Sequence, residues 1–250
     1  MFSFLNAGID PEVFQYFKIS DDLKSEIAKF SIQGYAEEHF KTKMKWGVFG
    51  RKTVKACERN LGFHAKLSHA LTVLDKDLTK NALNLFHSIQ KYMDKFAEGE
   101  PDEKRGQNLL ALVRSQDELR YSKNGMMEEL FCQLVQQTTN NPHPCSLERG
   151  WELLAVLVLC GLVPQTDLMI VIIGHANACR YTPSATGAFA LIVHTALVCH
   201  VKALKETGSL DSTVKFPPIC DLDYEKHIVP LRSGFIAEKV CRYFIVYITN

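Results

Sequence analysis

The sequence predicts an all-α protein, a compact helical bundle around a central helical hairpin. Apolar residues recur at the three- and four-residue spacing of amphipathic helices along several segments. Two such segments lie within residues 126–162 and are joined by a short Asn- and Pro-rich turn. The composition, with 46% hydrophobic and 23% charged residues among 250, is that of an ordinary globular protein with a sizeable core.

The central hairpin is the clearest element. One face of its first helix is apolar at helical spacing: Met127, Leu130, Phe131, Leu134 and Val135. Pro142 and Pro144 end this helix, because a proline disfavours the helical conformation of the residue before it. Ser146 is the predicted N-cap of the second helix. Trp151 and Leu154 belong to a run that is apolar nearly all round, which predicts a buried helix.

The segments before the hairpin are less regular. Residues 1–19 form an aromatic-rich extension, and a helix is predicted to begin at Ser20 and to continue to Phe40. Residues 77–96 are a second amphipathic helix. Residues 97–106, rich in charge, Gly and Pro, are predicted to be a mobile loop.

The segments after the hairpin predict two more helices, residues 168–178, capped by Thr166 or Asp167, and residues 185–204. The second contains a run from 185 to 201 that falls just short of a membrane span and includes His194 and His200, so we predict a core helix. Residues 221–228 follow as a linking helix. Residues 242–248, rich in β-branched and aromatic residues, predict a short C-terminal strand.

The net charge of +1 gives no global argument for nucleic-acid binding. Residues 41–66 differ, because eight lysines and arginines there are opposed only by Glu58. Gly47 and Gly50 predict a loop that exposes Trp46 and Phe49 among these cations. Aromatic anchors with steering charge suit an acidic partner, although a solvated basic face is the plain alternative. The predicted partner-binding residues are Lys41, Lys43, Lys45, Trp46, Phe49, Arg51, Lys52, Lys55 and Arg59.

Motifs that carry chemistry are missing from the sequence. The glycine spacing at 47–53 does not match a phosphate-binding loop, and no zinc, nucleophile-elbow or nucleotide motif occurs. The eight cysteines are scattered, mostly in apolar runs, which predicts reduced, buried thiols of a cytosolic protein. The sequence therefore predicts a protein that is not an enzyme and that needs neither cofactor nor metal.

Three segments also carry a family resemblance. LFCQLVQQTTNNP at 130–142, followed by RGWELL at 149–154, resembles the signature of the myosin tail homology 4 domain, a helical module of unconventional myosin tails and some kinesins. ALNLFHSIQKYM at 82–93 is similar to another helix of that family. KFPP at 215–218 resembles the segment that leads into a FERM domain in tandem proteins. The helix predicted to end at Phe40, which is followed by basic residues, also resembles the family's opening helix, so the resemblance covers about residues 21–218.

The resemblance implies an N-terminal extension at 1–19, a helical domain at 20–210, and a linker at 211–250 that is either the start of a FERM first lobe or a tail packed on the helices. It also implies a non-catalytic, cytoplasmic, cytoskeleton-associated module. Its partners would be microtubules or acidic cargo and adaptor peptides, bound through the basic segment, with a FERM domain in tandem and without nucleic acid. Two alternatives remain open: a peripheral protein, without a transmembrane segment, that binds anionic lipid through the same residues, and an enzyme with an unrecognised site.

Overall fold

The computed structural model describes residues 21–29, 31–40, 42–47, 50–55, 61–94, 99–207 and 221–229. These residues form a helical bundle with a β-hairpin near its N-terminal end. The elements in chain order are α2 (Asp21–Lys29), α3 (Ile32–His39), β1 (Thr42–Gly47), β2 (Gly50–Lys55), α4 (Leu78–Tyr92), α5 (Asp102–Arg114), the 3-10 helix η3 (Asp117–Tyr121), α6 (Met126–Thr138), α7 (Pro144–Leu159), α8 (Thr166–Cys179), α9 (Ala185–Thr207) and the π-helical turn η5 (Tyr224–Ile228). The all-α prediction for the body of the protein is confirmed.

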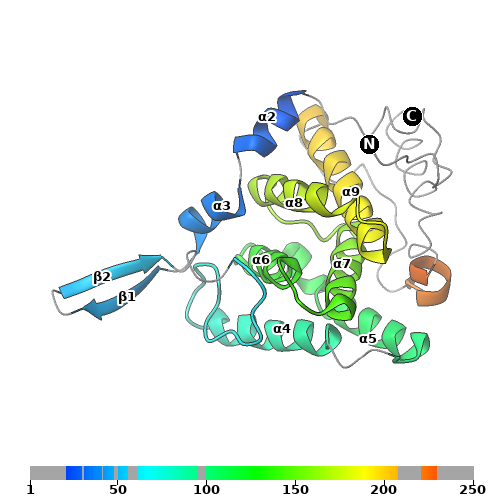
Figure 1. Ribbon diagram of the computed structural model, residues 1–250, viewed down its shortest axis with the longest axis horizontal. Helices are drawn as coiled ribbons and strands as arrows, with labels where there is room; N and C mark the ends of the chain where they lie inside the picture. Colours follow the sequence, from blue (N-terminus) through cyan, green and yellow to red (C-terminus); the bar gives the residue numbers. More distant parts are fainter. Residues whose placement is uncertain are drawn as a thin grey trace.

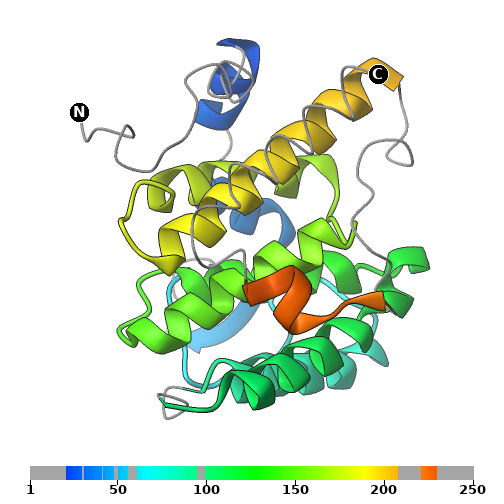
Figure 2. The same ribbon diagram turned by 90° about the vertical axis from the view of Figure 1, so that its right-hand side faces the viewer.

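The helices are arranged in layers around the pair α6 and α7. α8 and α9 pack on one side of this pair, and α4 and α5 pack on the other (Figure 1). α2 and α3 contact α8 at the outside of the first layer. η5, far along the chain, contacts α5 and lies beside it in Figure 2.

The predicted hairpin is the centre of the core. Every residue from Arg149 to Cys160 is buried, and the largest side chain among them, Trp151, has no exposed surface. α7 begins at Pro144 with His143 as its N-cap, so the predicted N-cap Ser146 was wrong and lies within the helix. Proline suits the first helical position, because the N–H that it lacks has no partner there. The Ser146 hydroxyl instead accepts a hydrogen bond from Asn141 Nδ2 at 3.1 Å.

The single helix predicted for residues 20–40 is two helices. Ser31 has extended backbone angles, φ −111° and ψ 154°, and its hydroxyl accepts a hydrogen bond from the Gly34 N–H. This is N-cap geometry, so Ser31 starts a new helix rather than continuing the first. The prediction missed this because serine also occurs within helices.

Residues 102–106 were predicted to lie in a mobile loop, and this was wrong. They form the first turn of α5, with Asp102 and Glu103 where carboxylates favour the helix dipole. Arg105 and Gly106 are buried. The prediction was wrong because charged residues and glycine were taken as signs of a loop, whereas Arg105 and Gly106 have specific partners in the fold.

α9 is long and apolar enough to cross a membrane, but 78% of its most apolar 18-residue stretch is buried within the protein. It packs along α7 and α8. Such burial is typical of a core helix, as the sequence predicted.

The cysteines that the structure describes are Cys132, Cys145, Cys160, Cys179 and Cys199, and all five are free thiols. Burial raises the pKa of the Cys160 thiol to about 12 and that of Cys199 to about 11. These thiols are protonated and behave as small apolar side chains. The predicted extension at 1–19 and the strand at 242–248 lie outside the described residues.

Candidate functional site

The basic segment forms a β-hairpin rather than the loop that was predicted. β1 and β2 pair in antiparallel fashion from Thr42 with Lys55 to Gly47 with Gly50. Between these ends, Lys45 is opposite Lys52 and Trp46 is opposite Arg51. Figure 1 shows the hairpin extending away from the helical layers.

Among the predicted binding residues, Lys43, Lys45 and Trp46 lie in β1, and Arg51, Lys52 and Lys55 lie in β2. Lys41, Phe49 and Arg59 lie outside the described residues. The two strands carry five lysines and arginines and no aspartate or glutamate. Polar and apolar residues alternate from Lys43 to Trp46, which is the period of a strand and a signal that the sequence analysis did not use.

The base of the hairpin is joined to the core. Phe40, just before β1, forms an isolated antiparallel bridge with Thr72, and the Val73 N–H donates to the His39 carbonyl at 3.3 Å. Glu129 on α6 in turn holds Thr72: its carboxylate accepts from the Thr72 N–H at 2.7 Å and from the Thr72 hydroxyl at 2.6 Å.

Glu129 has no exposed surface and is also held by its other neighbours. It accepts hydrogen bonds from the Leu71 N–H at 2.9 Å and from Gln133 Nε2 at 2.7 Å. A buried carboxylate depends on its hydrogen-bond donors, because no water is present to solvate it. Glu129 therefore fixes the strand-like segment at 71–72 against α6. Sequence reasoning did not identify this role of Glu129.

A second buried cluster joins α4, α5, α7 and η5. Glu152, with no exposed surface, accepts from Tyr92 Oη at 2.6 Å and from Arg105 Nε at 2.8 Å. Arg105 Nη2 also donates to Glu152 at 2.5 Å and to Glu148 at 2.9 Å. Tyr224 Oη donates to the other Glu152 oxygen at 3.2 Å. Burial, and then the charge of Glu152, raise the pKa of Tyr92 well above its usual value, so its phenol remains a donor.

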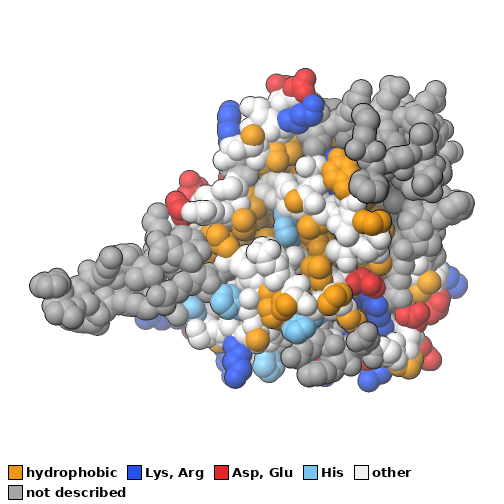
Figure 3. Space-filling model, in the orientation of Figure 1, with side chains coloured by type: hydrophobic (Ala, Val, Ile, Leu, Met, Phe, Trp, Pro, Cys, Tyr) orange, Lys and Arg blue, Asp and Glu red, His pale blue; other side chains and the backbone are white. Residues whose placement is uncertain are grey.

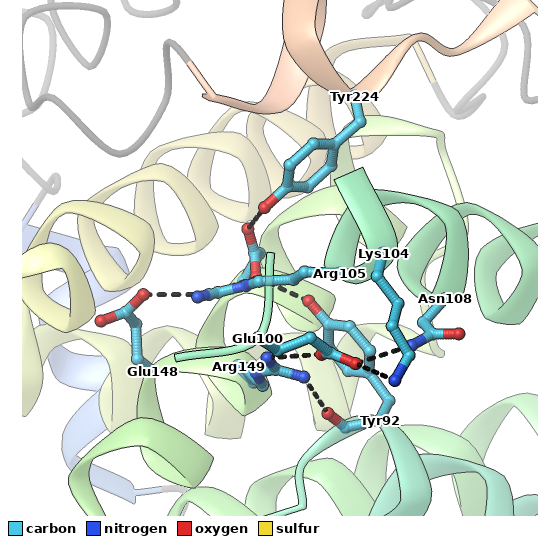
Figure 4. Close-up of polar contacts among 9 residues, drawn as sticks. Tyr92, Glu100, Lys104, Arg105, Asn108, Glu148, Arg149 and Tyr224 are labelled. Atoms are coloured by element: carbon cyan, nitrogen blue, oxygen red, sulfur yellow. Dashed lines mark hydrogen bonds and ion pairs between the residues drawn. The ribbon is translucent and has the colours of Figure 1, made fainter. Parts of the chain in front are cut away.

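Arg149 extends the cluster toward the end of α4. Its Nη1 donates to the Tyr92 carbonyl at 3.0 Å, and its Nη2 is 2.7 Å from Glu100. Figure 4 shows Glu148 turned toward Arg105 and Glu100 turned toward Arg149. Every charge here has an opposite charge in contact, so the cluster is organised as a structural network.

The described histidines do not form a metal site, and within this part of the chain no group of three histidine, cysteine or acidic residues is close enough to hold an ion. His175 stacks on Trp151 with ring centroids 4.8 Å apart, and its Nε2 is 2.9 Å from the Thr138 hydroxyl. Burial lowers the pKa of His175 to about 4. It serves the core as a neutral ring.

An open groove of about 430 Å³ lies between α4 and the segment from η3 to the start of α6. Leu85 and Leu119 contribute to its lining with Asn81, Asn84 and Gln116, and Glu118 is the one titratable residue there. An acid–base mechanism needs convergent titratable groups, and this groove does not supply them. On the face in Figure 3, apolar and histidine side chains gather near the middle, and charged side chains lie mainly toward the rim.

Comparisons with known proteins agree with this architecture. Residues 117–209 match the family model of the MyTH4 domain. Unconventional myosin heavy chain 6 of Caenorhabditis elegans is 39% identical over 79 residues, which cover 32% of this chain and 4% of that protein. Kinesin-like protein KIN-14I of Oryza sativa subsp. japonica is 28% identical over 155 residues, which cover 57% of this chain and 12% of that protein. The chain thus spans a small part of the length of these relatives.

A solved structure shows the same fold. The MyTH4-FERM MF1 domain of myosin VII from Dictyostelium discoideum superposes with a TM-score of 0.53 at 19% sequence identity, covering 74% of this chain and 35% of that one.

A buried helical hairpin between two helical layers defines an all-α helical domain. The family match makes the class more specific: residues 117–209 match the MyTH4 domain, and this range includes the resemblance noted at 130–154. MyTH4 domains are non-catalytic modules of myosin and kinesin tails.

Proposed function

We propose that this MyTH4 domain binds microtubules or acidic cargo peptides through the basic hairpin β1–β2. The observation that carries the proposal is the density of cations: five lysines and arginines in two paired strands, with no acidic residue among them. Basic residues concentrated on a projecting element steer an acidic partner and release bound counterions when it docks.

The anchoring of the hairpin supports this proposal. The bridge between Phe40 and Thr72 and the contacts of Thr72 with Glu129 fix the base of the hairpin to the buried helix α6. A binding element whose base is already ordered loses less conformational entropy when its partner binds. The helical bundle then serves as the rigid support of the hairpin.

The wider setting follows from the relatives. The solved neighbour is a MyTH4-FERM tandem, and we propose the same order here, with a helical domain at 20–210 and a linker at 211–250 that begins a FERM first lobe. The relatives are an unconventional myosin heavy chain and a kinesin-like protein. The proposed location is accordingly the cytoplasm, in association with the cytoskeleton.

Co-sedimentation with microtubules across a salt series tests the proposal. Charge reversal at Lys43, Lys45, Arg51 and Lys52 should abolish binding, and wild-type binding should weaken steeply as salt screens the charges. The matched control reverses four exposed lysines outside the hairpin: Lys76, Lys80, Lys91 and Lys123. Equal binding by the hairpin variant and the wild type, to microtubules and to polyglutamate alike, would falsify the assignment of the hairpin.

Binding of anionic lipid is the second candidate, because Trp46 lies among the same cations and aromatic side chains anchor proteins at membrane interfaces. Flotation with phosphatidylserine-containing vesicles separates the two candidates. A Trp46→Ala variant should lose vesicle binding if the lipid candidate holds, and should keep most of its salt-sensitive binding to microtubules if the first candidate holds.

A further inference from the structure

The segment at 221–229 contacts the helical domain through large buried side chains. Leu222, Tyr224 and Ile228 are 3%, 6% and 0% exposed, whereas Glu225 and Lys226 between them face solvent. The side chain of Asp223 accepts from the Lys226 N–H at 2.9 Å and so caps the short turn from within. The segment thus has one apolar face turned to the domain and one polar face turned outward.

Tyr224 is inserted between α5 and the buried cluster on α7. Its hydroxyl donates to Glu152 at 3.2 Å, and Figure 4 shows its ring pointing toward the group around Arg105. The ring lies directly on the backbone of α5 at Gly106, where an added Cβ would be 2.4 Å from the Tyr224 Cγ. Only glycine at position 106 leaves room for this ring. Arg114, the last residue of α5, donates a hydrogen bond from Nη2 to the Leu222 carbonyl at 3.3 Å.

The family match ends at residue 209, twelve residues before this segment begins. The contacts of 221–229 are therefore additional to the matched part of the MyTH4 domain, and they are made with α5 and α7 at a site far from the hairpin β1–β2 (Figures 1 and 2). The Tyr224 phenol is held by the Glu152 carboxylate and by the space at Gly106. The Leu222 carbonyl is held by the Arg114 guanidinium.

We propose that α5 and α7 form a docking surface for a short tyrosine-anchored segment, and that residues 221–229 of the same chain occupy it as a latch. Docking fixes the point at which the following chain leaves the helical domain. Loss of the tyrosine anchor releases the segment as a unit, because its turn is too short to be stable alone. The proposal is independent of the hairpin and stands or falls separately from the function proposed above.

Gly106→Ala in the full chain is the sharpest test, because the two outcomes have opposite signs. Alanine is a better helix former than glycine, so without docking the substitution should raise the melting temperature. With docking, the new methyl group displaces Tyr224. Hydrogen exchange at 221–229 should then become about tenfold faster or more, while exchange within α6 and α7 and the helical circular dichroism remain as in the wild type.

A double-mutant cycle isolates the contact. Tyr224→Ala should release 221–229 on its own, and Gly106→Ala should be neutral or stabilising in that background, since the ring it would displace is gone. Glu225→Gln, on the exposed side of the same turn, is the matched control and should leave exchange unchanged. Unchanged exchange at 221–229 in Gly106→Ala would overturn the proposal.

Binding in trans identifies the occupant. A fluorescent peptide with the sequence of residues 219–231 should bind the full-length Tyr224→Ala protein with saturable anisotropy, and the same peptide carrying Tyr224→Ala should not. Protection of 221–229 in the wild-type protein should also be independent of concentration. Protection that disappears on dilution would assign the occupant to a second copy and overturn the same-chain latch.

Discussion

Glu152 and Glu129 are both fully buried carboxylates, and their surroundings differ. Glu152 has a cationic partner, since Arg105 Nη2 is 2.5 Å away. Glu129 is held by neutral donors, namely backbone N–H groups, a hydroxyl and an amide. The consequences of losing a partner differ accordingly. Removal of Arg105 leaves a buried charge without its counter-charge, whereas removal of one neutral donor to Glu129 leaves the others in place.

Arg105→Met should destabilise the protein by about 3–5 kcal/mol, because it leaves Glu152 as an uncompensated charge in the core. Urea unfolding followed by circular dichroism gives the free energy of unfolding. Lys104→Met is the control on the same helix, since Lys104 is 68% exposed and its contact with Glu100 is 3.3 Å long. That loss should be below about 1 kcal/mol. Equal losses in the two variants would show that the cluster contributes little.

The elements differ in how well the sequence predicted them. α6 and α7 were predictable because their apolar residues repeat at helical spacing over thirteen and sixteen residues, Pro142 stands between them and Pro144 begins the second. α5 was missed because Arg105 and Gly106 read as loop residues, and their use became visible only with Glu152 and Tyr224 in place. The β-hairpin β1–β2 was predicted to be a loop, because the prediction rested on Gly47 and Gly50 and did not use the short alternation of polar and apolar residues at 43–46.

The sequence predicted which residues make up the candidate site, but not their β-hairpin structure or its attachment to α6. The cluster of cations at 41–59 is a local property of the sequence, so the segment could be selected from charge alone. Its attachment depends on Thr72 and Glu129, which are 57 residues apart along the chain. A contact of this range leaves no local signal in the sequence.

At the scale of the element, Glu129→Gln tests whether α6 anchors the base of the hairpin. Glutamine keeps one acceptor oxygen and replaces the other with an amide that faces donors, so about 1–3 kcal/mol of stability should be lost. Exchange of the Leu71 and Thr72 amides should increase before that of the rest of the domain. Glu128→Gln, at the adjacent and more exposed position, should leave these amides protected. Protection at 71–72 that survives Glu129→Gln would contradict the anchoring role.

At the scale of the whole molecule, the core contains buried histidines as well as apolar side chains. Burial lowers the pKa of His175 and His200 to about 4 and, together with the charge of Arg180, lowers that of His194 to about 3. All three rings lie on α8 and α9, the helices that complete the core beside α7. The layer that encloses Trp151 is therefore the layer that acid should weaken first.

Stability should fall as the pH drops from about 6.5 toward 4. In this window the unfolded chain binds protons at its histidines, whose ordinary pKa is 6.5, while the folded protein keeps the three buried rings neutral. Each ring that remains neutral contributes a slope of about 1.4 kcal/mol per pH unit.

His175→Gln retains a partner for the Thr138 hydroxyl and removes one titrating group. The slope of stability against pH should therefore decrease by about 1.4 kcal/mol per pH unit. Urea unfolding at a series of pH values measures it, with the exposed His87→Gln as the control. A slope that is the same in all three proteins would mean that burial of these histidines does not govern the acid sensitivity of the fold.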